Sequence, residues 1–532
     1  MPDNTKDMLL IELKEENKQL REQNEALLAL IKEQQELIEN LKEQIKFLSD
    51  KLFGTSSEKK IITNEAQINL FNEAEVEAQQ QETEEDDSVV VKEHTRKAKA
   101  THEEMFKGMK VNKIVETLPE EEQICPVCGE QMEVIGETYV RREIMFTPAK
   151  CEVNEIYTTS YGCPNCKEGN GDTETATIIK APVKPALIEK SYATSSLVSR
   201  IMYQKYANSI PLNRQEKEWE QYGVKLNRST MSSWILYCAQ NYFKPVFDYF
   251  HRELLKREFL MADETRVQVL DEPGRRPETD SFMWVYRTGE DGGDPIILYE
   301  YTATRAGDHA AEFLKGFQGY LETDGYQGYN KVPEIKRCSC WAHIRRYFVD
   351  AIPNGKQYDM KQPSVQGVSY CDRLSREERS INEKCGGDYE KRKEMRLKKE
   401  KPILAAFFAW LETLNPQKGS RLEKAVNYAL NRKEAAVRYL EDGRCSFTNN
   451  LSENAIRPFA IGRKNWLFAQ SVNGAESSAL VYTMVEMAKT YSLNVMGYLS
   501  FLLESRPSVE WTDEQFAEIA PWGEKAKEFK MK

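Results

Sequence analysis

The sequence predicts a multidomain α+β protein, in which helical parts and a part with a β-sheet follow one another along the chain. Its 532 residues exceed what one hydrophobic core usually serves, because chains longer than ~250–300 residues split into domains. The N-terminal end carries a heptad pattern, which is typical of a coiled coil. The middle of the chain alternates apolar and polar residues in three runs, which indicates strands with helical periodicity on both sides.

The charge of the chain is unevenly distributed. The net charge of −11, from 74 basic and 85 acidic residues, argues against a protein that coats nucleic acid by bulk charge. Phosphate binding depends on local clusters, however. Residues 73–87 contain eight acidic residues and no basic one, whereas residues 184–257 contain twelve Lys/Arg against six Asp/Glu. The first pattern is typical of a solvated linker, and the second indicates a candidate DNA-binding surface.

The number of cysteines and the length of the apolar runs indicate where in the cell the protein is located. Eleven cysteines in so long a chain are too few for a disulfide framework, and the C-x-x-C pairs among them favour a reducing compartment and a metal. The N-terminus lacks a basic region followed by an apolar region. The longest apolar run, Ile403–Leu411, has nine residues, fewer than the ~20 of a membrane span. We expect a cytoplasmic protein that does not bind membranes.

Residues 1–53 are predicted to form a coiled coil that joins protomers into a homodimer or a higher oligomer. Asparagine at one seam position fixes the register and favours a parallel dimer at some loss of stability. The alternative is a single amphipathic helix packed on its own protein. The two seams are formed by Leu10, Asn17, Asn24, Ile31, Ile38, Ile45 and Leu52, and by Leu13, Leu20, Leu27, Gln34, Leu41 and Leu48.

A predicted zinc module follows a flexible acidic linker. The linker, residues 54–110, lacks periodicity and apolar surface. In residues 111–185, the strings CPVCG and CPNC can place four thiolates tetrahedrally around a structural Zn2+ ion. The alternatives are buried reduced thiols or a redox dithiol. The alternating segment between the two pairs predicts a small sheet, in which Cys151 lies. The predicted zinc ligands are Cys125, Cys128, Cys163 and Cys166.

Residues 186–257 are predicted to be helical and to contain a helix-turn-helix. Gly223 is the turn candidate, and Ser229 or Asn227 can cap the second helix. The early residues of that helix would face a DNA groove or phosphates. The alternative is a plain helical hairpin. The candidate DNA contacts of this region are Arg214, Arg228 and Thr230.

Residues 258–350 predict the first part of a catalytic core. Three strand-like runs, EFLMADETRVQVL, SFMWVYRTG and PIILYEYTAT, precede a helix-like stretch at 305–317. A fourth strand is expected at 320–324, and a fifth strand-like run, KRCSCWAHI, follows it. Three strands, a helix and then further strands is the order of the ribonuclease-H-like fold.

The rest of the chain is predicted to contain a helical insertion, the second part of that core and a C-terminal tail. Residues 351–447 have helical apolar spacing and basic stretches, which predict a helical insertion. Residues 448–490 would form the second part of the core, and residues 491–532 a C-terminal helical tail.

Three acidic residues stand where an acid is otherwise awkward, and together they predict a metal site. Asp263 lies inside an apolar strand-like run, Asp324 ends another, and Glu453 opens a helix. A buried carboxylate needs a compensating partner, and a divalent cation is one. Each acid has an alternative explanation: a bulge for Asp263, a turn at Asp324, and a capping box of Glu453 with Asn450.

Several longer strings carry a resemblance to a known family. They are LFGTSSEK, the CPVCG and CPNC pairs, PLNRQE with NRSTMSSW, MADETRVQVL, TDGYQGY, CWAHIRRYF, TNNLSENAIRPFAIGRKNWLF and APWGEK, in this order. Over nearly the whole chain they resemble the large transposase of the insertion-sequence-66 family, a bacterial mobile-element enzyme with an Asp-Asp-Glu site. The resemblance implies that Asp263, Asp324 and Glu453 are catalytic and hold two Mg2+ (or Mn2+) ions. Cys340 and His343 resemble an accessory Cys-x-x-His element of such transposases, and the alternative is that the two residues serve packing alone.

The implied activity is metal-dependent cleavage of element ends and strand transfer into target DNA. The partners would be the terminal inverted repeats, the target DNA and possible small companion proteins of the same element. Arg463 and Lys464, in the basic and aromatic string IGRKNWLF, are further candidate DNA contacts. Two alternatives remain open: a non-catalytic DNA-binding protein derived from a transposase, and a nuclease that cleaves without joining.

Overall fold

The computed structural model describes residues 151–162, 178–180, 182 and 184–531, together with scattered positions between Lys18 and Gln35. The chain divides into two units, residues 1–117 and 118–532. In the first unit the described positions are helical. Leu27 and Ile31, two seam residues of the predicted coiled coil, are 55% and 46% exposed. The other parts of the predicted coiled coil and the predicted linker lie outside the described residues.

Two short strands flank the second cysteine pair. β1 (Ser160–Gly162) and β2 (Ile178–Lys180) pair antiparallel. Cys151, which we predicted within a sheet, is exposed, and residues 151–159 form no strand. This prediction was wrong because nothing among the described residues covers the apolar side chains there, and Val153 is 88% exposed. The predicted zinc ligands lie outside the described residues: Cys125, Cys128, Cys163 and Cys166.

The helical region after the strands contains the predicted helix pair. Gly223 takes φ +79°, a conformation that glycine adopts without strain, in the turn between the two helices. The side chain of Asn227 accepts the N–H of Thr230 at 2.8 Å and caps the second helix. The cap is therefore Asn227 and not Ser229. The elements are α6 (Ser195–Met202), η2 (Tyr203–Ala207), α7 (Leu212–Gln221), α8 (Arg228–Cys238), η3 (Ala239–Phe243) and α9 (Lys244–Leu255).

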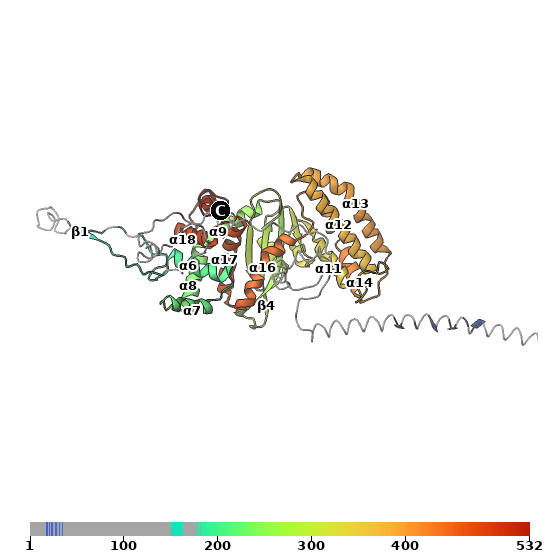
Figure 1. The fold of residues 1–532 in the computed structure, drawn as a ribbon, viewed down its shortest axis with the longest axis horizontal. Coiled ribbons are helices and arrows are strands. Elements are labelled where there is room, and N and C mark those ends of the chain that lie inside the picture. The colour runs from blue at the N-terminus through green and yellow to red at the C-terminus, as the bar shows by residue number, and fades with distance from the viewer. Residues whose placement is uncertain are drawn as a thin grey trace, which may run out of the picture. The chain divides into compact units, whose positions relative to one another are not determined.

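A six-stranded sheet forms the middle of the second unit (Figure 1). Its strand order is β5-β4-β3-β6-β7, and β8 also pairs with β3. β3, β4 and β5 are antiparallel neighbours, whereas β6 and β8 run parallel to β3, and β7 runs parallel to β6. The strands are β3 (Phe259–Asp271), β4 (Asp280–Thr288), β5 (Ile297–Thr302), β6 (Tyr320–Thr323), β7 (Lys336–Ser339) and β8 (Ala469–Ser471).

The predicted order of these elements is confirmed. Three strands are followed by a helix, α10 (Gly307–Phe313), which is shorter than predicted, and then by β6 and β7. A short 3-10 helix, η4 (Gln327–Lys331), lies between β6 and β7.

The fifth strand-like run was predicted too long. β7 ends at Ser339, and α11 (Trp341–Asp350) occupies the rest of the run and the residues after it. Trp341, Ile344 and Phe348 are buried, and this spacing of three and four residues follows the period of a helix. The indole of Trp341 also donates to the carbonyl of Ala436 at 2.8 Å. Packing against the following helices therefore decides the conformation here.

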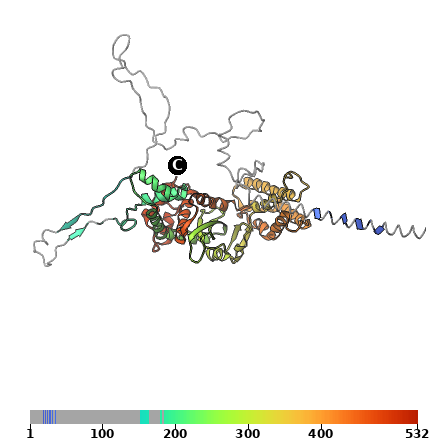
Figure 2. The same cartoon turned by 90° about the horizontal axis from the view of Figure 1, so that it is seen from below.

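The predicted insertion is helical. Figures 1 and 2 show α12, α13 and α14 gathered at one end of the unit, beyond the edge of the sheet that β7 forms. These helices share a core of their own with α11, in which Phe407, Leu411 and Ala429 are fully buried. The elements are α12 (Pro363–Cys385), α13 (Tyr389–Thr413), α14 (Arg421–Leu430), α15 (Lys433–Val437) and η5 (Arg438–Leu440).

The C-terminal helices cover the other edge of the sheet. Along β5, the N–H of Tyr299 donates to Oγ1 of Thr483 at 3.0 Å, and the N–H of Ile297 to Sδ of Met487 at 3.1 Å. Side chains of α17 thus occupy donors that an exposed edge strand would leave free. No helix of the described residues is long and apolar enough to cross a bilayer. The helices are α16 (Asn450–Trp466), α17 (Val472–Thr490), α18 (Val495–Ser505), α19 (Asp513–Ile519) and η6 (Lys525–Phe529).

The sheet opens along one edge of β3. On this edge β6 pairs with Phe259–Met261, and β8 pairs with Val269 and Asp271. Between them, β3 has no partner strand on this side among the described residues. The side chain of Asn449, at the start of α16, donates to the carbonyl of Ala262 at 3.0 Å. The opening therefore brings the N-terminus of α16 against the middle of β3.

Candidate active site

Asp263 lies on β3 at the point where the strand leaves β6. The four residues before it are buried, because this half of β3 runs through the core. Its pairing with β4 is continuous, with Asp263 opposite Val285, so the alternative of a bulge is rejected. Burial raises the pKa of Asp263 well above its usual value, and the negative charges of Glu264, Asp324 and Glu453 raise it further.

Asp324 follows the last residue of β6. The parallel register pairs Phe259 with Tyr320 and Met261 with Glu322, and its continuation sets Asp324 opposite Asp263. Oδ1 of Asp324 accepts the N–H of Tyr326 at 2.8 Å, which is the predicted turn. This turn does not use the second oxygen, because Oδ2 faces Nη2 of Arg305 at 3.8 Å.

Glu453 stands in the first turn of α16. The helix begins after Asn449, and the side chain of Asn449 makes no capping bond. Oε1 of Glu453 is buried and has no hydrogen-bond partner among the described residues, and the same holds for Oδ1 of Asn450. The alternative of a capping box with Asn450 is therefore rejected. The Glu453 side chain is 19% exposed. Its Oε1 atom is therefore largely shielded from solvent and accepts no hydrogen bond from a described protein donor.

The three predicted acids are close enough to interact electrostatically. The negative charges of Asp324 and Glu453 raise the pKa of Asp263, although the three residues come from β3, the end of β6 and α16. Mutual repulsion and a buried oxygen without a donor are costly unless a cation offsets them. Carboxylate oxygens are the ligands that Mg2+ and Mn2+ prefer. The donor set therefore fits a hard divalent cation.

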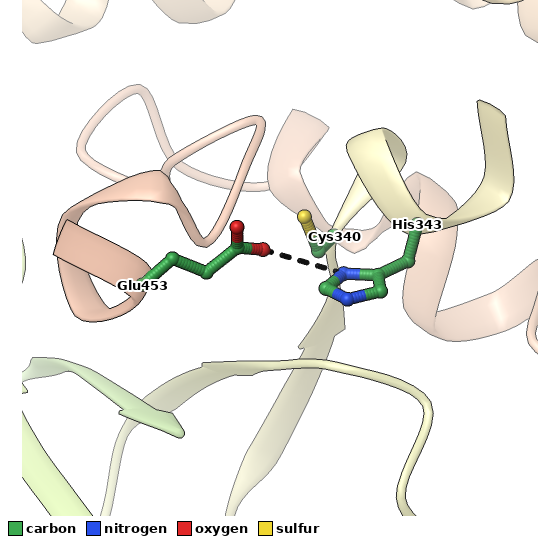
Figure 3. A group of neighbouring side chains, drawn as sticks. All are labelled: Cys340, His343 and Glu453. Carbon is green, nitrogen blue, oxygen red and sulfur yellow. Dashed lines mark ion pairs between the residues drawn. The ribbon is translucent and has the colours of Figure 1, made fainter. Parts of the chain in front are cut away.

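Cys340 and His343 lie beside Glu453 (Figure 3). Nδ1 of His343 is 3.7 Å from Oε1 of Glu453, and one ligand atom from each of the three residues lies within 4.8 Å of the others. Burial lowers the pKa of His343, against the effect of Glu453. Burial raises the pKa of Cys340 to about 12. Sequence reasoning named this pair as accessory, but it did not predict the contact with Glu453.

Two residues that sequence reasoning missed also border the site. Glu264 has a side chain that is 1% exposed, and Arg305 pairs with it. Nε of Arg305 donates to Oε1 of Glu264 at 2.8 Å, and the hydroxyl of Tyr329 donates to Oε2 at 2.6 Å. The guanidinium of Arg305 also lies 4.1 Å from the ring centre of Tyr326. The position of Glu264 directly after Asp263 was a usable signal, whereas nothing in the local pattern marks Arg305.

The predicted DNA contacts do not join the acids. Arg214 and Arg228 are exposed on α7 and α8, and Thr230 is half-buried. Lys464 is exposed and Arg463 half-buried near the end of α16. Ten residues along α16 from Glu453, Arg463 lies about 15 Å farther along the helix axis at ~1.5 Å per residue. These five side chains therefore stay candidates for contacts with DNA outside the acidic site.

Three stretches of the chain match known protein families. Residues 190–477 match the family described as "Transposase IS66 family". Residues 40–122 match "Transposase C of IS166 homeodomain". Residues 122–167 match "zinc-finger binding domain of transposase IS66", and this range includes all four predicted zinc ligands. The last match supports a structural zinc ion.

Relatives of similar length come from the bacterium Sinorhizobium fredii. The chain is 32% identical to the uncharacterized protein y4qI over 361 residues, which is 65% of this chain and 65% of that protein. It is 27% identical to the uncharacterized protein y4jD over 421 residues, covering 76% of this chain and 79% of that protein. The chain thus spans somewhat less than two thirds of y4qI, and neither name assigns an activity.

Proposed function

We propose that this chain, which belongs to the IS66 family of transposases, cleaves the ends of a mobile element and joins them to target DNA. The proposal is supported by the charges of Asp324 and Glu453, which act on Asp263 although the three acids come from distant parts of the chain. A purely structural role leaves the buried Oε1 of Glu453 without a donor.

We assign the core to the ribonuclease-H-like fold. The support is the strand order β5-β4-β3-β6-β7, with three antiparallel strands followed by parallel ones. In this assignment the first acid lies on the first strand of the core and the second just after the fourth. The third arrives on a helix after the helical insertion of residues 351–447.

Asp263, Asp324 and Glu453 would hold two Mg2+ or Mn2+ ions. Such a pair of ions stabilises the attacking and leaving oxygens of an in-line phosphoryl displacement. Asp263 and Asp324 present carboxylates from neighbouring strands, and Glu453 closes the site from α16. The same geometry serves hydrolysis at the element end, with water as nucleophile, and joining, with the freed 3'-hydroxyl as nucleophile.

Recognition of the element ends falls to the parts before the core. The zinc module and the pair α7 and α8 would bind the terminal inverted repeats, mainly through phosphate contacts that position the DNA. The exposed Arg214 and Arg228 support this role, with Thr230 at the start of α8. Arg463 and Lys464 would hold DNA farther along α16.

The N-terminal heptads would pair protomers so that two element ends are handled together. The exposure of Leu27 and Ile31 in one chain supports a partner on that face of the helix, because a second helix would bury them. Small companion proteins of the same element would be further partners. The DNA substrate sets the bacterial cytoplasm as the place of action.

A strand-transfer assay tests the proposal. Duplexes that carry the terminal inverted repeats of the encoding element, pre-cleaved to expose the 3'-hydroxyl, are incubated with the full-length protein, Mg2+ and a supercoiled target plasmid. Joined products are expected. Cleavage of uncut ends without joining would instead identify a nuclease, and binding without either reaction a non-catalytic DNA-binding protein.

A further inference from the structure

We propose that Cys340, His343 and Glu453 form a second cation site, which takes a soft divalent ion of the zinc type and shares Glu453 with the proposed magnesium site. That Glu453 also belongs to a magnesium site rests on the proposed function, whereas the binding of a soft ion by Cys340, His343 and Glu453 does not. The described residues hold this one group of Cys, His, Asp and Glu side chains whose ligand atoms converge within 4.8 Å.

The fold delivers the three donors from two helix N-termini. Cys340 is the N-cap residue of α11, and His343 lies in the first turn of that helix, so both side chains lie at the same end of α11. Glu453 lies in the first turn of α16. Figure 3 shows its carboxylate directed at the imidazole, with the thiol of Cys340 beside them. All three side chains are thus presented by the rigid ends of packed helices.

The hydrogen bonding of the group is incomplete without a cation or a proton. Nδ1 of His343 and Oε1 of Glu453 are buried, and neither has a hydrogen-bond partner among the described residues. They lie 3.7 Å apart. If Nδ1 carries no proton, both atoms are acceptors and repel each other, and either a proton on Nδ1 or a cation between the two atoms removes this repulsion. By contrast, Sγ of Cys340 already accepts the backbone N–H of Asn449 at 3.1 Å, a bond that favours a thiolate.

The donor chemistry selects the ion. One sulfur, one imidazole nitrogen and one carboxylate oxygen suit zinc, whereas magnesium prefers oxygen ligands alone. A thiolate and a carboxylate offset the charge of a divalent cation. Zinc bonds of ~2.0–2.3 Å imply ligand atoms about 3.3–3.7 Å apart in a tetrahedron. The three ligand atoms lie within 4.8 Å of one another, so small side-chain rotations would bring them to these distances. A fourth position stays open for water.

Binding at this site has a proton cost. Cys340 must release its thiol proton when the ion binds, and metal affinity then depends on pH. The site offers three protein ligands, one fewer than the predicted four-cysteine module, so it should bind zinc more weakly and fill only at excess zinc. When it is filled, Glu453 is held away from Asp263 and Asp324.

The direct test counts zinc. Full-length wild type and variants are equilibrated with excess zinc, desalted and measured by elemental mass spectrometry together with protein concentration. We expect wild type to retain one zinc ion per chain more than Cys340→Ser and His343→Asn. The matched control, Cys338→Ser, removes a neighbouring buried thiol outside the group and should keep the wild-type value. Equal zinc in all four proteins overturns the inference and leaves a shared proton as the explanation.

Cobalt gives a second readout that does not depend on complete folding of every variant. Cobalt added to wild type that already holds zinc in its four-cysteine module should produce a thiolate-to-cobalt absorption band. The band should be absent from His343→Asn, whose substitution is at a side chain that is 19% exposed and is tolerated more readily than one at the buried Cys340. A band of equal strength in this variant also overturns the inference.

The zinc count and the catalytic assay test two proposals that can be rejected independently of each other. If wild type joins DNA but the zinc counts do not differ, the second site is wrong and the transposase proposal stands. If the counts differ but no variant or wild type cleaves DNA, the site stands and the proposed function is wrong. If both hold, excess zinc should slow cleavage by wild type more than cleavage by His343→Asn.

Discussion

Nδ1 of His343 lies 3.7 Å from Oε1 of Glu453, although the two residues are 110 positions apart in the sequence. Asn449 helps to fix this meeting point, because its N–H donates to Sγ of Cys340 and its side chain donates to the carbonyl of Ala262. One buried asparagine thus ties the start of α16 to both α11 and β3, and the position of Glu453 depends on it.

Asn449→Ala should therefore damage catalysis more than DNA binding. Asn449 is fully buried, so loss of its side-chain bond should cost about 1–3 kcal/mol of unfolding free energy. Displacement of Glu453 should slow cleavage on the order of 10- to 100-fold. Urea denaturation and a cleavage assay check both effects. The control is Asn382→Ala, at an exposed position on α12, which should change neither. Wild-type cleavage by Asn449→Ala would show that Asn449 does not position Glu453.

Arg305 is expected to contact a DNA phosphate beside the acids. Its side chain is 42% exposed, pairs with Glu264 and lies 3.8 Å from Oδ2 of Asp324. Arg305→Ala should weaken binding of pre-cleaved ends and reduce the slope of log Kd against log salt by about 1. Fluorescence anisotropy at several salt concentrations measures the slope. The control is Lys315→Ala. It removes a positive charge on a side chain that is 76% exposed, just after the C-terminal end of α10. An unchanged slope for Arg305→Ala would exclude the contact.

The sequence predicted much of the framework because local patterns determine it. The alternation of apolar residues marked β3, β4 and β5, and Gly223 and Asn227 marked the turn and the cap between α7 and α8. The three acids were also identified from local conflicts between charge and an apolar setting.

The remaining features depend on contacts between distant residues. Trp341 begins a helix inside a strand-like run because it packs against the insertion, where its indole meets the carbonyl of Ala436. The partnership of Glu453 with His343, and that of Glu264 with Arg305, join residues that no local pattern connects. The coiled coil and the four-cysteine zinc site stay predictions in structural terms, because their residues lie mostly outside the described part of the chain.

The partly buried carboxyl of Glu300, on β5, predicts a pH dependence of stability. Burial raises the pKa of Glu300 to about 8 from a usual value of 4.5. The fold therefore favours the protonated form, and stability is lost as pH rises from about 4.5 to about 8, by up to ~1.4 kcal/mol per pH unit. Glu300→Gln should raise Tm relative to wild type at pH 8 but not at pH 4.5. Glu278→Gln, at an exposed position, is the control, and a Tm difference independent of pH would contradict the assignment.

Charge in the heptad seam should separate the protomers. Glutamate in place of Ile31 and Ile38 puts carboxylates at positions that a second helix would bury, so repulsion and desolvation oppose pairing. Light scattering should then give the monomer mass. Gln19→Glu, at a described and exposed helical position outside the seam, should keep the wild-type mass. An unchanged mass for the seam variant would reject dimerisation through this segment.

Asp263, Asp324 and Glu453 are proposed to hold together the ions for strand cleavage. Asp263→Asn, Asp324→Asn and Glu453→Gln keep the size of each side chain but remove the negative charge that binds the cation. Each should retain binding of the element ends in anisotropy measurements, because none of the three substitutions removes a basic side chain that we expect to contact DNA. Glu278→Gln serves as the matched surface control.

The most direct measurement is the rate of end cleavage by these three variants in Mg2+, with end binding measured on the same preparations. We expect all three variants to bind the ends as wild type does and none of them to cleave at a detectable rate. Cleavage at the wild-type rate by any one of them would show that the acid concerned holds no ion that the reaction needs.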